Sequence, residues 1–155
     1  MNDATSSNTA PALSAEEVCA LRAVAGLMIP ASAEYQVPGA DDDLIFPEIM
    51  STLGAETDVV RRALQCLDAL SEGVFADLAA DAKNVAVSEF AAGHPLLSWM
   101  LVMVIVRCYY RDDRVMRSLD MEVRPPFPVG FEVEQGDWSL LDPVRARGKI
   151  YRDAP

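Results

Sequence analysis

The sequence has few of the residues that catalytic and metal sites need. It contains one histidine, His94, and three cysteines, Cys19, Cys66 and Cys108, more than 40 residues apart and without a C-x-x-C pair. One histidine excludes the paired Glu-x-x-His motifs of di-iron proteins and the H-E-x-x-H motif of zinc proteases. The glycine-rich loops G-x-G-x-x-G and G-x-x-x-x-G-K-[ST], which bind nucleotide phosphates, are also missing. The sequence therefore predicts no catalytic, cofactor-binding or metal site in this chain.

Two weaker alternatives use these scarce residues. The three cysteines and His94 would form a zinc site if their helices converged, and His94 would be the base of a Ser-His-Asp triad. The wide spacing instead favours separate thiols that pack in a helical core. A histidine between Gly93 and Pro95 is typical of a helix cap. Both patterns favour a chain that is not itself an enzyme.

Basic residues are outnumbered. The 155 residues include 13 Lys and Arg against 24 Asp and Glu, which gives a net charge of −11. This charge repels phosphate backbones, so we expect no binding to nucleic acid. Residues 1–106 carry 15 acidic and 4 basic residues, whereas residues 107–155 carry 9 of each. The division predicts an acidic body and a C-terminal end that docks onto another protein.

No hydrophobic run is long. The longest, residues 96–106, has eleven residues broken by Ser98, and at ~1.5 Å per residue it reaches roughly half-way across a bilayer's hydrocarbon core. It predicts a buried central helix and no membrane insertion. Residues 1–13 show neither a basic cluster, nor paired arginines, nor an apolar run. We expect a disordered N-terminus there and a cytoplasmic protein, or a periplasmic one if a partner exports it.

Helical periodicity extends over residues 14–119. Ser14 and Glu17 form a capping box before a helix that ends ahead of Pro30. The same periodicity predicts five further helices, over residues 44–53, 56–72, 81–92, 96–110 and 112–119. Phe75 is expected in a connecting turn packed on the core, and no stretch alternates as strands do. We predict an all-α fold, a compact bundle of about five to six helices.

Two groups of side chains in the body admit a functional interpretation. Asp41–Asp43 could bind a hard cation, but they also suit a solvated helix start, where carboxylates complement the helix dipole. Trp99, Met100 and Met103 could line a cofactor pocket, but their helical spacing favours core packing. We favour the structural interpretation for both groups.

Four arginines are spaced three or four residues apart and are predicted to share one helix face: Arg107, Arg111, Arg114 and Arg117. They could pair with neighbouring acids such as Asp112 and Asp113, which would stabilise the fold only slightly. They could equally recognise an acidic surface on a partner. The sequence leaves both interpretations open.

Residues 120–155 differ from the body. They hold five of the ten prolines and show no clear helical pattern, and the Pro-rich run at 124–128 favours extended backbone. Aromatic side chains dominate the energetics of protein interfaces, so we expect this extended tail to dock onto a partner rather than fold back over its own helices. The predicted partner-binding residues are Tyr109, Tyr110, Arg111, Arg114, Pro125, Pro126, Phe127, Phe131, Trp138 and Tyr151.

Short motifs in the body resemble a known family. Leu27-Met28-Ile29-Pro30 followed by Val37-Pro38-Gly39-Ala40, and later Tyr109-Tyr110-Arg111-Asp112-Asp113, are similar to motifs of the gluconate 2-dehydrogenase subunit 3 family. The resemblance covers most of residues 14–128. The chain departs from the family pattern at Cys108 and Asp120, where glycines are expected.

The resemblance implies a non-catalytic small subunit. Its partner would be a large dehydrogenase of the glucose–methanol–choline oxidoreductase type, which carries FAD and oxidises an alcohol or sugar hydroxyl. This chain would hold no cofactor and would support the folding, stability or assembly of the large chain in a hetero-oligomer. The alternative is a free-standing helical adaptor or chaperone that binds its partner transiently.

Overall fold

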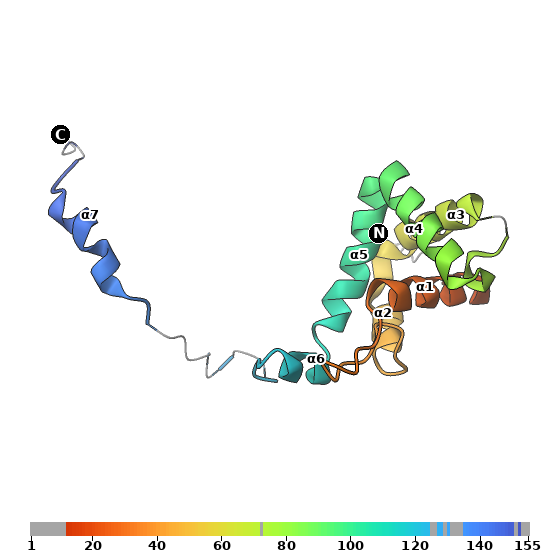
Figure 1. Ribbon diagram of the computed structural model, residues 1–155, viewed down its shortest axis with the longest axis horizontal. Coiled ribbons are helices and arrows are strands. Elements are labelled where there is room, and N and C mark those ends of the chain that lie inside the picture. Colours follow the sequence, from red (N-terminus) through yellow and green to blue (C-terminus); the bar gives the residue numbers. More distant parts are fainter. Residues whose placement is uncertain are drawn as a thin grey trace, which may run out of the picture. The chain divides into compact units, whose positions relative to one another are not determined.

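The computed structural model describes residues 12–71, 73–124, 127–128, 130, 135–150 and 152. The chain divides into two compact units, Met1–Val123 and Arg124–Pro155. The first unit, here called the body, contains α1 (Ala15–Met28), α2 (Ile45–Thr52), η1 (Gly54–Glu56), α3 (Thr57–Leu70), η2 (Phe75–Asp77), α4 (Ala80–Gly93), α5 (Pro95–Tyr109) and α6 (Asp113–Ser118) (Figure 1). The second unit, the tail, contains η3 (Trp138–Leu141) and α7 (Asp142–Ala146).

The all-α prediction is confirmed. The described residues contain helices and turns, with a single isolated bridge between Ser32 and Val37 in place of any β-strand. The predicted capping box is present: the Ser14 hydroxyl accepts from the Glu17 amide at 3.2 Å, and the Glu17 carboxylate accepts from the Ser14 amide at 2.8 Å. Pro30 follows the C-cap of α1 as expected.

The core lies where α3 packs against α5, α4 and α1, with α2 packed against α5. Phe75 in η2 is completely buried, which confirms the predicted turn beneath the helices. The largest side chains with almost no exposed surface are Phe75, Phe90, Leu21, Ile45, Ile49, Leu64, Leu67 and Ile105. Because these residues come from all of the first five helices and the turn before α4, the body has one continuous core.

Three expectations about these elements need correction. The helix α5 buries only the side that carries Leu101, Val104 and Ile105, so it is not buried all round. The four arginines do not share one helix face, because α5 ends at Tyr109 and the chain turns before α6 begins. The tail is not without helix: η3 (Trp138–Leu141) is capped by Asp137, whose carboxylate accepts from the amide of Ser139 at 3.0 Å, and α7 follows directly.

Among the described residues, no single helix combines the length and apolar composition needed to cross a bilayer. The pair α4 and α5 meets that test only when counted together, and it is bent by 118° at the break between the two helices.

Candidate protein-docking surfaces

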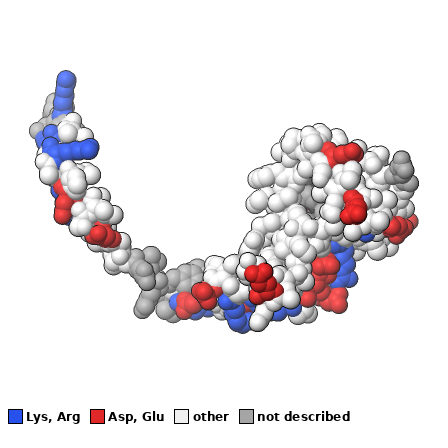
Figure 2. All heavy atoms as spheres, viewed as in Figure 1, with Lys and Arg blue, Asp and Glu red and all other residues white. Residues whose placement is uncertain are grey.

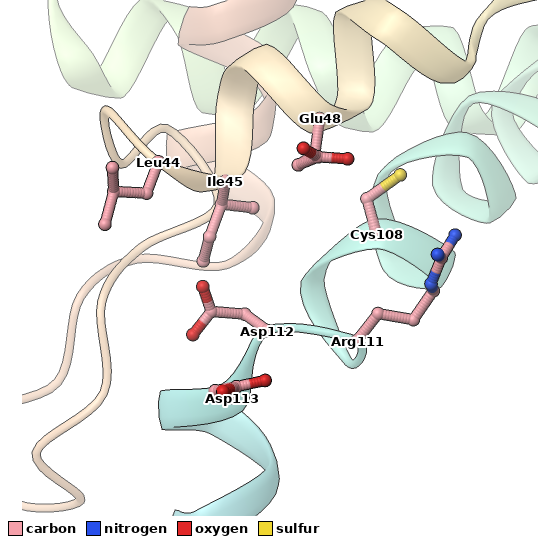
Figure 3. A pocket seen from close by; sticks show the side chains of 7 residues that line it. All are labelled: Leu44, Ile45, Glu48, Cys108, Arg111, Asp112 and Asp113. Carbon is pink, nitrogen blue, oxygen red and sulfur yellow. The ribbon is translucent and has the colours of Figure 1, made fainter. Parts of the chain in front are cut away.

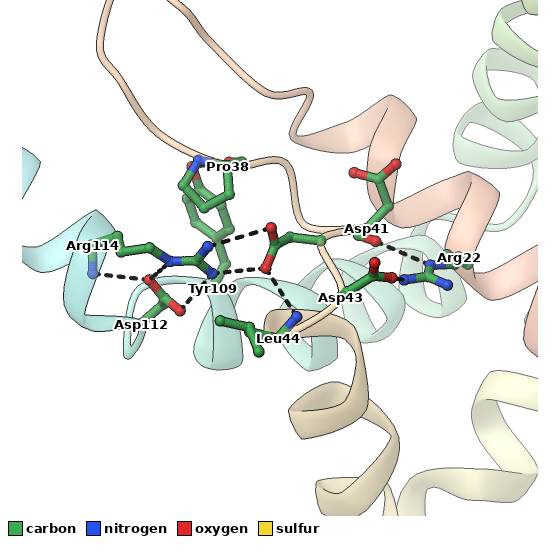
Figure 4. A network of polar contacts seen from close by, with 9 residues as sticks. Arg22, Pro38, Asp41, Asp43, Leu44, Tyr109, Asp112 and Arg114 are labelled. Atoms are coloured by element: carbon green, nitrogen blue, oxygen red, sulfur yellow. Dashed lines mark hydrogen bonds and ion pairs between the residues drawn. The ribbon is translucent and has the colours of Figure 1, made fainter.

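The two motif segments of the sequence meet in a cluster of polar contacts, here called the polar junction (Figure 4). Its members are Arg22, Pro38, Asp42, Asp43, Tyr109, Asp112 and Arg114. The Tyr109 hydroxyl donates to the Pro38 carbonyl at 3.1 Å across 71 residues of sequence. The Arg114 guanidinium bridges two carboxylates, Asp42 at 2.7 Å and Asp112 at 3.0 Å. Arg22 donates to the Asp41 carbonyl at 3.0 Å and pairs with Asp43.

Hydrogen bonds set the ionisation of the polar junction. Donation from Arg114 holds the pKa of Asp42 and of Asp112 below the usual range, and the Leu44 amide adds to the effect at Asp42. The same bonds raise the pKa of Arg114 above its ordinary value. Desolvation raises the pKa of Tyr109. All four groups therefore keep their ordinary charge states near neutral pH, and neither carboxyl is poised to act as an acid.

The loop before α2 can approach the helices this closely because Gly39 has no side chain. A Cβ there would lie 2.4 Å from Asp41 Oδ1 and 3.0 Å from the backbone nitrogen of Ala31. The next residue, Ala40, is buried, and its amide donates to the Ile29 carbonyl at 2.9 Å. The motifs that carry the family resemblance thus fasten the loop to the end of α5.

Two of the predicted partner-binding residues make contacts within this chain instead. Tyr109 is only 4% exposed, so its prediction as an interface anchor is not supported. Arg114 is held by Asp42 and Asp112 on its own chain. Asp41 and Asp43 are exposed as expected of a solvated segment, whereas Asp42 is half-buried and paired with Arg114. Arg114 pairs with Asp112, and Arg117 pairs with Asp113 at 3.2 Å. These contacts agree with the interpretation in which the arginines pair with neighbouring acids.

A surface hollow of about 250 Å³ lies beside the junction (Figure 3). It is lined by Leu44, Ile45, Glu48, Cys108, Arg111, Asp112 and Asp113. Asp112 is already committed to Arg114, and the buried thiol of Cys108 lies 3.2 Å from the Thr52 hydroxyl. The hollow is therefore lined by side chains of both charges, but its nucleophile, the Cys108 thiol, is not paired with a base. Arg111, a predicted partner-binding residue, is exposed at its rim.

The zinc site that the sequence left open is not formed by the residues that the structure describes. In the part of the chain that the structure describes, no three His, Cys, Asp or Glu side chains converge as metal ligands. Cys19 is exposed, Cys66 half-buried and Cys108 buried, so the prediction of a core position is wrong for Cys19. His94 is exposed between α4 and α5, with its ring centroid 5.8 Å from that of Phe90.

Large apolar side chains are exposed to solvent on one side of α5 and at its C-cap, Tyr110. Leu96, Trp99, Met103 and Tyr110 recur every three to four residues, apart from one position taken by Arg107, and are 69, 60, 43 and 51% exposed. They are here called the α5 stripe. Figure 2 shows mostly uncharged atoms over this part of the body, whereas charged atoms gather near α6. The prediction that Trp99 and Met103 pack in the core is wrong.

The tail presents a second set of apolar side chains. Phe127 is 84% exposed and Trp138 60%, and the remaining exposed apolar residues of the tail are Leu140, Leu141, Val144 and Ile150. The Trp138 indole donates to the Gln135 side chain at 3.3 Å. Four of the predicted partner-binding residues, Pro125, Pro126, Phe131 and Tyr151, lie outside the described residues.

Sequence reasoning missed the α5 stripe, although a signal was present. Residues 96–106 are apolar on every side of the helix, and such a helix is either buried all round or has a face that another molecule covers. The periodicity of the sequence does not show which of these two cases applies to residues 96–106.

Comparisons with known proteins gave no match: neither a scan of protein-family models, nor a search of curated proteins, nor a search of solved structures found a similar protein.

Proposed function

We propose that this chain is a non-catalytic small subunit that binds and stabilises a large FAD-dependent alcohol or sugar dehydrogenase of the glucose–methanol–choline type. The observation that carries the proposal is the exposure of large apolar side chains in the tail, above all Phe127 and Trp138. A protein that works alone rarely leaves such side chains in water, whereas an obligate partner covers them.

The choice of partner depends on the motif resemblance. In this chain the motifs Val37-Pro38-Gly39-Ala40 and Tyr109-Tyr110-Arg111-Asp112-Asp113 contact each other through Tyr109 and Pro38. A body with one continuous core that presents exposed surfaces suits a stabilising subunit, because binding then orders few additional groups. The flavin and the oxidation of the hydroxyl group belong to the large chain in this proposal, and this chain supplies binding energy.

Aromatic anchors can supply that energy. A tryptophan buries about 150–250 Å² at an interface, and at about 25 cal/mol per Å² full coverage is worth about 4–6 kcal/mol before the costs of association. Trp138 is already 40% covered in the free chain, since it is 60% exposed, so its share falls to about 2–4 kcal/mol. A few such anchors account for a stable complex.

A free-standing adaptor or chaperone is the second candidate. It is favoured by the continuous core of the body, which lets this chain fold before any partner binds. The two candidates differ in what remains after assembly, since a subunit stays in the finished enzyme at fixed stoichiometry and a chaperone leaves it.

Co-expression with the candidate large subunit tests the proposal. We expect the two chains to co-elute from a size-exclusion column as a yellow complex with flavin absorbance, and the large chain expressed alone to be insoluble or colourless. Deletion of residues 121–155 should abolish co-elution. Separate peaks, with the large chain fully loaded with flavin by itself, would refute the subunit proposal and leave the adaptor.

A further inference from the structure

The α5 stripe is an exposed apolar surface that the tail-based proposal does not use. We propose that the groove beside this stripe receives an uncharged apolar ridge of the same flavin-bearing partner, so that the chain holds its partner at two places. This inference rests on the function proposed above and adds a second contact to it.

The groove has the shape of a receptor for side chains. It encloses about 210 Å³ between α5 and the start of α3, and it is lined by Glu56, Val59, Trp99, Met100, Met103, Val104 and Arg107. Val104 is buried at its base, while Trp99 and Met103 stand exposed at its side. Methionine side chains adapt to the shape of an incoming apolar group, and tryptophan is enriched among the residues that carry most of the binding energy of interfaces.

The lack of unpaired charge in the groove restricts which side chains of a partner can occupy it. From Phe90 to Val106 the sequence has no charged residue. The two charged residues of the groove satisfy each other, because Arg107 donates to Glu56 at 2.9 Å and also to the Thr52 carbonyl at 3.0 Å. A charged group on the partner would lose its hydration there and gain no counter-ion. The occupant is therefore apolar and uncharged.

The net charge of the chain argues against a second copy of this chain as the occupant. Each copy carries a net charge of −11, so two bodies placed side by side repel each other, and the basic residue of the groove, Arg107, is already paired with Glu56.

Affinity measurements with the full-length chain test the inference. The complex of the large subunit with wild type, Trp99→Ser or Leu96→Ser is obtained by co-expression and its Kd is measured by dilution, and Val85→Ser serves as the matched control. Val85 is an apolar residue 57% exposed on α4, outside the stripe. We expect the two stripe variants to raise Kd about tenfold or more and the control to leave it unchanged. Circular dichroism checks that all variants are folded.

The outcomes separate this inference from the proposed function. If wild type binds and both stripe variants bind equally well, the second contact is refuted and the subunit proposal stands. If wild type does not bind the large subunit at all, both are refuted. If wild type sediments as a dimer that Trp99→Ser converts to a monomer, the groove belongs to a second copy of this chain and the inference is overturned.

Discussion

Replacement of Arg114 by methionine should destabilise the body by about 2 kcal/mol. The guanidinium donates four hydrogen bonds to Asp42 and Asp112, and a bond to a charged group is worth about 1.5–3 kcal/mol when it is shielded from water. The three side chains are 37, 25 and 16% exposed, so solvent screening reduces the sum to about 2 kcal/mol. Methionine retains the aliphatic packing and removes only the charge and the donors.

This loss corresponds to a measurable fall in Tm. Unfolding entropy near 60 °C is about 2.1 cal/mol/K per residue, or about 0.23 kcal/mol/K for a body of about 110 residues, so Tm should fall by about 9 °C. Thermal unfolding followed by circular dichroism at low salt measures it. Arg117→Met is the matched control, because Arg117 and Asp113 form an ion pair with both side chains 62% exposed, and such pairs contribute about 0.5 kcal/mol or less.

The effect should depend on pH with a definite sign. The pKa of Asp42 and of Asp112 is lowered in the folded state, so the unfolded chain takes up protons at higher pH than the folded one. The stabilisation is present above the unfolded pKa, which is about 3.9, and is lost as the pH falls through the folded values. The Tm difference between wild type and Arg114→Met should therefore shrink towards pH 3. Equal losses from Arg114→Met and Arg117→Met, or a loss that is unchanged at low pH, would refute this reasoning.

Three further predictions concern the body. Gly39→Ala should cost about 1–3 kcal/mol, because a Cβ meets backbone atoms there, whereas Gly93→Ala, which meets nothing within 4 Å, should be neutral or slightly stabilising in a thermal melt. Cys19 is exposed and Cys108 buried, so a thiol reagent should modify Cys19 quickly in the native protein and Cys108 only on unfolding; rapid loss of both thiols would contradict the fold. Ser14→Ala removes the capping box of α1 and should lower the free energy of unfolding by about 1 kcal/mol, measured by urea denaturation.

The body's helices could be predicted because their signals are local. Ser14 with Glu17 starts α1, Pro30 follows its end, and the turn at Phe75 separates two periodic segments. The short helical stretch in the tail escaped prediction, because a 3₁₀ turn and a five-residue helix are too short for a periodic pattern to develop.

The contacts of the polar junction could not be predicted from spacing. Arg114 pairs with Asp42, which lies 72 residues earlier, whereas sequence reasoning considered only acids beside the arginines. Tyr109 has the residue type of an interface anchor, and only the structure shows that its hydroxyl is bonded to Pro38. Amphipathic periodicity identifies a face, but it does not show whether the chain's own helices or another molecule will cover an all-apolar helix such as α5.

The two tryptophans offer the most direct test of docking. The chain has only Trp99 and Trp138, one on the α5 stripe and one in the tail, and each is 60% exposed. The full chain labelled with 5-fluorotryptophan gives two ¹⁹F resonances, which Trp99→Phe and Trp138→Phe assign. When the labelled chain exchanges into an excess of the unlabelled complex obtained by co-expression, we predict that both resonances shift and lose their H₂O/D₂O solvent-isotope effect. If both keep the solvent-isotope effect of the free chain at saturating partner concentrations, neither surface is a docking surface and the account is contradicted.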